Sequence, residues 1–217
     1  MFLPQLYVLH GLSWRRFALC ARLGKENYCR KFIQTGLYGY MAFSVNDEKQ
    51  EQILNSEVII HAAAMVRPVS FFDITANDLL NSFTVNVISS LLLTRTIVPA
   101  MIDRSWGRIV NLSSIGVKFG GGVKTFCYSL SKHALEFFPQ EHKSWSKSNV
   151  LINTLRVGVT DTRIHKIDPE KDMNKRIEMI PMGRMATPEE IANTVYWLGS
   201  DQNTFMTGQV IATAGGE

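Results

Sequence analysis

A short apolar run, followed by a glycine-rich loop and an amphipathic segment, constrains the fold of this 217-residue chain most strongly. The run Arg108-Ile-Val-Asn-Leu-Ser-Ser114 predicts a buried strand, because its apolar residues end at a turn-prone Ser-Ser-Ile-Gly. Tyr128-Ser-Leu-Ser-Lys132 opens a segment with apolar residues at helical spacing, which predicts a helix over residues 128–138. A strand that leads through a loop into a helix is the building unit of parallel sheets.

Similar strands and helices alternate along the rest of the chain. Val58-Ile-Ile60 is a continuous apolar run, typical of a strand covered on both faces. Thr187-Pro-Glu-Glu predicts a helix start, with threonine as the cap, proline in the first turn and acids at the positive end of the helix. Further strands are expected near residues 6–9, 28–34, 40–45, 150–155 and 208–211, and further helices over 13–25 and 79–101. We predict an α/β fold: a doubly wound, Rossmann-type parallel sheet with helices on both faces, in a single domain over residues 1–217.

The composition is that of an ordinary soluble protein, with 46% hydrophobic and 19% charged residues. The three cysteines and five histidines show no metal-ligand spacing, so we expect neither a metal site nor a disulfide framework. No apolar run approaches the roughly 18 residues of a membrane span. A cytoplasmic protein without a membrane partner is therefore expected.

The net charge of +4 has a local origin, because six basic residues fall within the first 31 positions. This cluster is compatible with a phosphate-bearing ligand or a nucleic acid, and equally with a solvated helix face. It contains no recognisable helix for reading DNA, so we expect no nucleic-acid partner.

Three side chains around the central strand suggest proton-transfer chemistry. Tyr128 and Lys132 lie four residues apart, so both project from one face of the predicted helix. A nearby ammonium favours phenolate, and we expect Lys132 to pull the pKa of Tyr128 below its reference value of about 10. Ser114 ends the strand at the sheet edge where parallel sheets bind ligands. Its hydroxyl could hold a substrate oxygen while the tyrosine exchanges a proton.

The combination of Ser114, fourteen residues before Tyr128, with Tyr128-x-x-x-Lys132 resembles the short-chain dehydrogenase/reductase family. The likeness extends from about residue 57 to the end of the chain and is greatest to 3-oxoacyl-carrier-protein reductases. The other segments that carry it are Glu57-Val-Ile-Ile-His-Ala-Ala-Ala64, Thr84-Val-Asn-Val-Ile, Val157-Gly-Val-Thr-Asp-Thr162, residues 180–190, residues 198–201, residues 205–211 and Gly215-Gly216.

The resemblance implies an NAD(P)-dependent oxidoreductase that interconverts a carbonyl and a secondary alcohol, with a small 3-oxoacyl-type ketone as the first candidate substrate. It implies that Tyr128 exchanges the proton, Ser114 orients the substrate oxygen, Lys132 lowers the tyrosine pKa and Asn86 links a proton relay to solvent. The cofactor-binding positions that it implies are Gly11, Ser13, Arg15, Arg16, Val45, Ala62, Ala63, Tyr128, Lys132, Gly158, Thr160 and Thr162.

Before about residue 57 the chain departs from the family pattern. The family's phosphate loop is Thr-Gly-x-x-x-Gly-x-Gly, whereas His10-Gly-Leu-Ser-Trp-Arg-Arg-Phe17 keeps Gly11 and has Arg15 and Phe17 in the later glycine places. The acid that would bind an adenine-ribose hydroxyl is missing near Thr35. Because arginines can bind an extra phosphate, we expect NADP(H) to be favoured over NAD(H).

Two alternatives remain open. The altered phosphate loop also fits a non-catalytic family member that binds cofactor weakly and acts through partners. His61-Ala-Ala resembles the sugar-nucleotide-modifying branch of the family, which allows an epimerase or dehydratase. In either case the resemblance implies a homo-oligomer, a dimer or tetramer, through the helices over 79–101 and 128–143. The segment 163–182, the expected substrate lid, is rich in charge and favours a polar or charged substrate.

Overall fold

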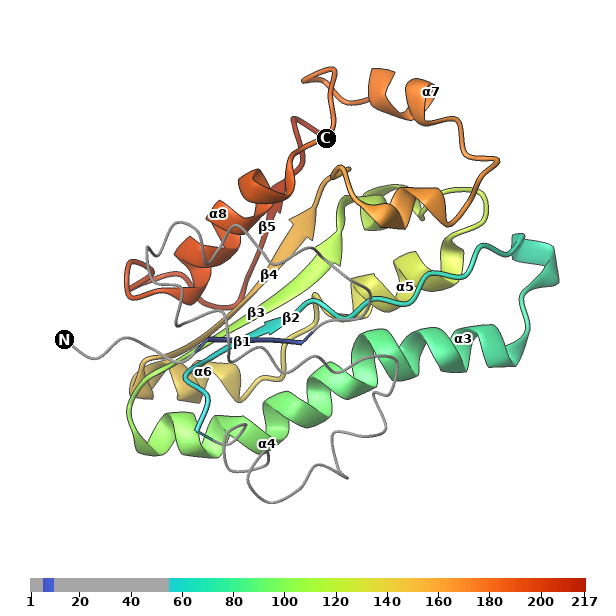
Figure 1. Ribbon diagram of the computed structural model, residues 1–217. Coiled ribbons are helices and arrows are strands. Elements are labelled where there is room, and N and C mark those ends of the chain that lie inside the picture. The colour runs from blue at the N-terminus through green and yellow to red at the C-terminus, as the bar shows by residue number, and fades with distance from the viewer. Residues whose placement is uncertain (1–5, 10–54) are drawn as a thin grey trace.

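The computed structural model describes residues 6–9 and 55–217, and within them five parallel strands form one sheet (Figure 1). The strands follow one another across the sheet in chain order: β1 (Leu6–Leu9), β2 (Val58–His61), β3 (Gly107–Ser114), β4 (Val150–Val157) and β5 (Gln209–Thr213). The strands predicted in these parts of the chain are therefore confirmed. The predicted strands at 28–34 and 40–45 and the helix at 13–25 lie outside the described residues.

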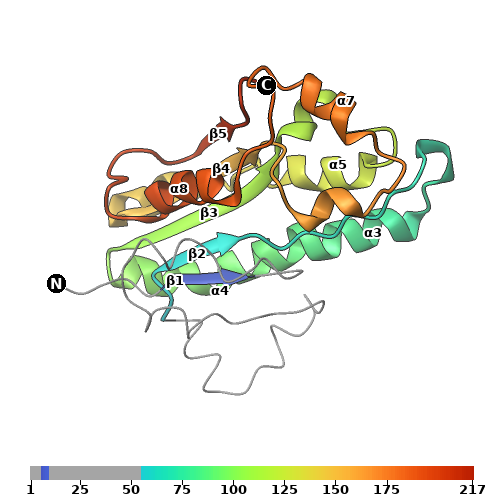
Figure 2. The ribbon, with the colours of Figure 1, turned by 45° about the horizontal axis from the view of Figure 1, so that its top comes forward.

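Helices cover both faces of the sheet, as predicted for a doubly wound fold. Helix α8 lies on one face, and α4 lies on the other with α5 and α6 (Figures 1 and 2). The helices are α3 (Ala76–Phe83), a π-helical segment (Thr84–Ile88), α4 (Ser89–Asp103), α5 (Phe126–Ala134), α6 (His142–Trp145), α7 (Met173–Glu178) and α8 (Pro188–Gly199). Short 3-10 turns occupy Phe71–Asp73, Ile115–Phe119, Ser146–Ser148 and Arg163–Lys166.

The two faces of the sheet divide the core because successive strand residues point to opposite sides. Ile59, Ile109 and Ile152 are neighbours in register and pack toward α4. Val58, Ile60 and Val110 point the other way and pack against α8. Each fully buried aliphatic side chain stabilises the fold by roughly 1.5–3 kcal/mol, so both faces fix the sheet firmly.

The long apolar helix is longer than the predicted range 79–101, running from Ala76 to Asp103 with the π-helical segment in its middle. By length and composition alone this helix could cross a membrane, so the expectation that no apolar run approaches the length of a membrane span is wrong. Its apolar character has a simpler cause here, since Leu93, Ile97 and Met101 are buried against the sheet.

Helix α5 is shorter than predicted. We expected it to reach residue 138, but it ends at Ala134. Pro139 supplies the reason, because it has no N–H to donate to the carbonyl of Leu135 in a continuing helix. That carbonyl instead accepts hydrogen bonds from the sheet, 2.8 Å from Thr154 Oγ1 and 3.2 Å from Asn111 Nδ2. The next helix, α6, begins only at His142.

Candidate active site

Ser114 and Tyr128 meet at the carboxyl end of β3. Ser114 is the last residue of the strand, and its hydroxyl accepts a hydrogen bond from the N–H of Gly116 at 3.2 Å. Tyr128 is the third residue of α5 and hydrogen-bonds to the same hydroxyl. Burial raises the pKa of Tyr128 to about 12, although the bond with Ser114 acts in the opposite direction. The phenol is therefore a protonated group at neutral pH.

Lys132 lies one helical turn after Tyr128 and is almost fully buried. Its Nζ donates to the carbonyls of Leu112 and Ala63, at 2.8 and 3.1 Å. Burial lowers the pKa of Lys132 to about 7. The Nζ is 6.0 Å from the centre of the Tyr128 ring.

The expectation that Lys132 lowers the pKa of Tyr128 is wrong for this structure. Burial is the largest influence on the phenol and opposes ionisation. The ammonium is bound to two backbone carbonyls rather than to the phenol oxygen. The sequence spacing correctly predicted that the two side chains lie on one face of the helix. It contains no information about how deeply the fold buries that face.

Asn86 is fully buried in the π-helical segment and ties two parts of the site together. Its side-chain oxygen accepts from the N–H of Met65 at 2.6 Å, and its Nδ2 donates to the Met65 carbonyl at 3.1 Å. The same Nδ2 donates to Ser131 Oγ at 2.9 Å, and Ser131 in turn donates to the carbonyl of Tyr128 at 2.7 Å. The amide thus links the segment after β2 to the helix that carries Tyr128 and Lys132.

Apart from Tyr128 and Lys132 on α5, the predicted cofactor positions that the structure describes lie beside β3, at the ends of its two neighbours. Ala62 and Ala63 follow β2, while Gly158, Thr160 and Thr162 follow β4. A Cβ on Gly158 would lie 2.5 Å from the Cα of Ala214, so only glycine fits there. The Thr160 hydroxyl donates to the Gly158 carbonyl at 2.9 Å. The remaining predicted positions lie outside the described residues: Gly11, Ser13, Arg15, Arg16 and Val45.

A row of buried polar side chains crosses the sheet beneath this edge. His61, Asn111 and Thr154 are neighbours in register on β2, β3 and β4. His61 Nε2 lies 2.9 Å from Thr94 Oγ1 of α4, and its Nδ1 has no hydrogen-bond partner within the described part of the chain. Burial, followed by the charge of Lys132, lowers the pKa of His61 to about 3, so the imidazole is neutral.

Sequence reasoning missed one side chain next to the site, Glu136. It lies four residues after Lys132, a helical spacing that was visible in the sequence. Its partners, Ser113 and Arg156, come from β3 and β4 and could not be paired with it from spacing.

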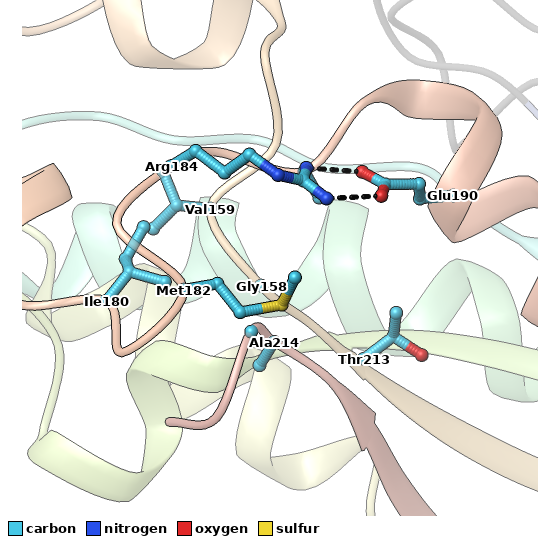
Figure 3. A pocket seen from close by; sticks show the side chains of 10 residues that line it. Gly158, Val159, Ile180, Met182, Arg184, Glu190, Thr213 and Ala214 are labelled. Carbon is cyan, nitrogen blue, oxygen red and sulfur yellow. Dashed lines mark hydrogen bonds and ion pairs between the residues drawn. The ribbon is translucent and has the colours of Figure 1, made fainter.

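A small cavity of about 80 Å³ opens beyond the ends of β4 and β5 (Figure 3). Its lining is mainly apolar, and Arg184 and Glu190 lie at one side, joined by two hydrogen bonds of 2.9 and 2.7 Å. The lining includes Gly158 but neither Ser114 nor Tyr128. This cavity therefore borders the predicted site without containing its reacting groups.

The segment expected to act as a substrate lid contacts the loop before α5. Lys124 of that loop forms an ion pair with Glu170. His165, within the segment, is partly buried, and burial first, then the charge of Lys171, lowers its pKa to about 4. The imidazole is therefore neutral near pH 7, and the charge of the segment comes from its lysines, arginines and acids.

Comparison with known proteins agrees with this geometry. The family model described as enoyl-(acyl carrier protein) reductase matches residues 44–217. The 3-oxoacyl-[acyl-carrier-protein] reductase FabG of Aquifex aeolicus is 34% identical over 161 residues, which cover 74% of this chain and 64% of that protein. The acetoacetyl-CoA reductase of Cupriavidus necator is 31% identical over 171 residues, which cover 78% of this chain and 69% of that protein.

A solved structure has the same fold. The 3-oxoacyl (acyl-carrier-protein) reductase of Agrobacterium tumefaciens C58, with NADP bound, has a TM-score of 0.74 at 24% identity, over 98% of this chain and 84% of that one. The family match covers most of the chain, and the fold and the curated relatives agree with it. This chain belongs to the short-chain dehydrogenase/reductase family of oxidoreductases.

Proposed function

We propose that this protein reduces a ketone to a secondary alcohol with a nicotinamide cofactor. The observation that carries the proposal is the protonated Tyr128 phenol beside the Ser114 hydroxyl at the carboxyl end of β3. Ser114 would hold the carbonyl oxygen, and Tyr128 would give that oxygen its proton as the oxygen gains charge. Asn86 would hold the tyrosine helix through Ser131, and Lys132 would supply the proton that replaces the one given up.

The groups around β3 fit the nicotinamide half of such a cofactor. Lys132 carries three N–H donors, of which two are bound to the carbonyls of Ala63 and Leu112. Small side chains at Ala62 and Ala63 allow the backbone to approach a ligand closely. On the other side of β3, Gly158 and Thr162 would bind the carboxamide. When bound, the cofactor supplies the hydride that the protein's own side chains lack.

We infer a preference for NADP(H) over NAD(H) from the sequence near the first turn. Arg15 and Arg16 supply charge that an additional phosphate would attract, and no acid stands where a ribose hydroxyl would be bound. The substitutions Arg15→Ala and Arg16→Ala together should weaken NADPH more than NADH. Equal losses for the two nucleotides would contradict the assignment.

A 3-oxoacyl thioester is the proposed substrate class. The two curated relatives are named for 3-oxoacyl-[acyl-carrier-protein] and acetoacetyl-CoA, two thioesters with a ketone at the same position. This chain spans about two thirds of the length of these relatives, 64% and 69%. Acetoacetyl-CoA is therefore the first compound to assay.

Cofactor titration tests the proposal against its main alternative. We expect NADPH to quench tryptophan fluorescence with micromolar affinity, and added acetoacetyl-CoA to oxidise the bound NADPH. If neither nucleotide binds, the chain is a non-catalytic family member whose altered phosphate loop has lost the cofactor. If nucleotide binds but a sugar nucleotide is converted without net oxidation, an epimerase or dehydratase replaces the reductase.

Tyr128→Phe separates catalysis from binding. The change removes the hydroxyl that gives the proton and keeps the ring that packs at the start of α5. We expect turnover to fall by roughly 10²–10⁴-fold, while NADPH affinity and melting temperature stay at wild-type values. Full turnover by this variant would remove Tyr128 from the mechanism.

We also propose that the protein assembles as a homo-oligomer, a dimer or tetramer, in the cytoplasm. One side of the helical layer stays apolar although it is exposed: Leu80, Ile88, Leu91, Leu130 and Phe137. Leu80, Ile88 and Leu91 lie along the long helix, Leu130 lies on α5, and Phe137 follows the end of α5. A second copy would remove these side chains from water.

A further inference from the structure

A buried carboxylate, Glu136, contacts the residues next to the predicted catalytic groups. The Glu136 side chain is only 6% exposed although it follows the end of α5. Arg156 binds it in a two-pronged arrangement, with Nε 2.8 Å from Oε1 and Nη2 2.7 Å from Oε2. Two parallel bonds of this kind fix geometry as well as charge. Glu136 is therefore held in one orientation.

The same carboxylate reaches the strand end that carries Ser114. The Ser113 hydroxyl lies 2.8 Å from Glu136 Oε1 and 3.0 Å from the carbonyl oxygen of Lys132. One hydroxyl proton is thus shared between the carboxylate and the backbone of the helix. Ser113 is 3% exposed, so water competes little for either contact.

These contacts join the three segments that converge on the candidate site. Ser113 precedes Ser114 on β3, the Lys132 carbonyl belongs to α5, and Arg156 lies two residues before Gly158 on β4. Ser113 and Arg156 are also paired neighbours in the sheet register. Glu136 lies above this pair and connects the helix to both strands.

The charges around Glu136 keep it ionised. Burial by itself raises its pKa, but the hydrogen bonds from Arg156 and Ser113 and the charges of Arg156 and His133 outweigh burial, and the pKa lies below its ordinary value. His133 Nδ1 approaches the outer oxygen at 3.2 Å from the exposed side. The Arg156 guanidinium responds with a raised pKa. The pair is therefore permanently charged near neutral pH.

We propose that Glu136 is a positioning residue for the reductase reaction, fixing Ser114 against Tyr128 and Lys132 through its contacts with Ser113 and Arg156. The inference rests on the proposed function. The shortness of α5 explains the need for such a residue. The helix has nine residues and ends well before Pro139, so continuing helical turns do not hold its last carbonyls in place. Only a short turn follows, in which the N–H of Leu135 donates to the Lys132 carbonyl at 3.2 Å. Sheet side chains add further bonds, from Ser113 to the Lys132 carbonyl and from Thr154 to the Leu135 carbonyl.

Four variants of the full chain test the proposal. Ser113→Ala removes the link between the carboxylate and α5, and Ser113→Thr keeps the hydroxyl. Glu136→Gln keeps the side-chain shape and removes the charge. Asn153→Ala is the matched control, because Asn153 is buried on β4 and its two hydrogen bonds, to Met206 and Gln209, bind the β5 side of the molecule.

Hydrogen–deuterium exchange of the peptide covering residues 126–136 tests the positioning without any substrate. We expect faster exchange there in Ser113→Ala and Glu136→Gln, and wild-type exchange in Ser113→Thr and in Asn153→Ala. The control should show that lost stability elsewhere does not loosen α5. Unchanged exchange in both test variants would overturn the proposal, whatever the enzyme does with ketones.

Steady-state kinetics with NADPH and acetoacetyl-CoA test whether loss of this positioning slows turnover. A misplaced catalytic group costs rate rather than binding, so kcat should fall about 10- to 100-fold in the two test variants with little change in KM. In the direction of alcohol oxidation, the acidic limb of the kcat profile should move to higher pH, since a displaced Ser114 hydroxyl no longer lowers the pKa of the Tyr128 phenol. Ser113→Thr should recover both parameters.

Hydrogen–deuterium exchange and kinetics together distinguish failure of the proposed reductase function from failure of the positioning role of Glu136. If the wild-type protein turns over no ketone, the proposed function fails, and the exchange data still decide whether Glu136 fixes α5. If exchange rises in the test variants but kcat and its pH profile stay at wild-type values, Glu136 is a stability residue and the positioning role is overturned.

Discussion

At the scale of single residues, burial controls the chemistry of the candidate site more than charge pairing does. Lys132 sits among backbone carbonyls, and burial depresses its pKa from 10.5 to about 7. An unfolded chain would hold the Lys132 proton up to pH about 10.5, whereas the folded chain releases it near pH 7. Between these values the unfolded state binds more protons, so folding stability must rise with pH.

We therefore predict that the free energy of unfolding increases as the pH is raised from about 7 to about 10. Tyr128 sets the upper limit, because its pKa is raised from 10.0 to about 12 and the unfolded state then loses its proton first. Urea denaturation at a series of pH values measures the slope. Lys132→Met should reduce the slope of the free energy of unfolding against pH. An unchanged slope in that variant would show that another group causes the pH dependence.

The residues of the predicted site differ in how far sequence could find them. Tyr128 and Lys132 form a local pattern, and the strand before them places Ser114, so all three were identifiable. The raised pKa of Tyr128 could not be predicted from the sequence, because it depends on the burial created by the whole fold. Glu136 was also missed, since its partners Ser113 and Arg156 are 23 and 20 residues away in the chain. Only the strand register brings those two together.

At the scale of elements, the start of α8 is the clearest agreement between sequence and structure. Thr187 caps the helix, its Oγ1 accepting from the N–H of Glu190 at 3.3 Å, while the Glu190 carboxylate accepts from the N–H of Thr187 at 2.8 Å. This reciprocal capping box satisfies two backbone donors. The helix then buries Ile191, Val195 and Leu198 against the sheet.

Thr187→Ala should lower the free energy of unfolding by about 1 kcal/mol, because it removes the cap from a helix that covers one face of the sheet. Thr187→Ser keeps the hydroxyl and should restore most of the loss. Both are measured by urea denaturation at constant pH. Equal stability of the alanine variant and the wild type would mean that solvent satisfies the first turn equally well.

The end of α5 shows where pattern reading fails. Apolar residues continue at helical spacing to Phe138, and this periodicity predicted too long a helix. Pro139 was the signal against it, since proline removes the hydrogen bond that the next turn requires. The partners that take over the Leu135 carbonyl, Asn111 and Thr154, come from other strands. Caps within one segment are readable from sequence, whereas caps supplied by the sheet are not.

At the scale of the whole molecule, the proposed oligomer accounts for the exposed apolar side of the helical layer. Phe137 is 85% exposed and Leu91 is 49% exposed, on neighbouring elements of the face that carries α4 and α5. Large apolar side chains that gather on one exposed face usually mark an interaction site. Burying it against a second copy would also shield the helix that holds Tyr128, so assembly and activity are expected to be linked.

Phe137→Glu and Leu91→Glu should shift the protein from dimer or tetramer toward monomer, because a charge at the centre of an apolar interface loses its water without gaining a partner. Sedimentation velocity at several protein concentrations measures the change. Phe205→Glu is the control: this side chain is 96% exposed, but it lies in the loop before β5. Dissociation by the control, but by neither helix variant, would place the interface at the edge of the sheet. A wild-type protein that sediments as a monomer would refute the oligomer.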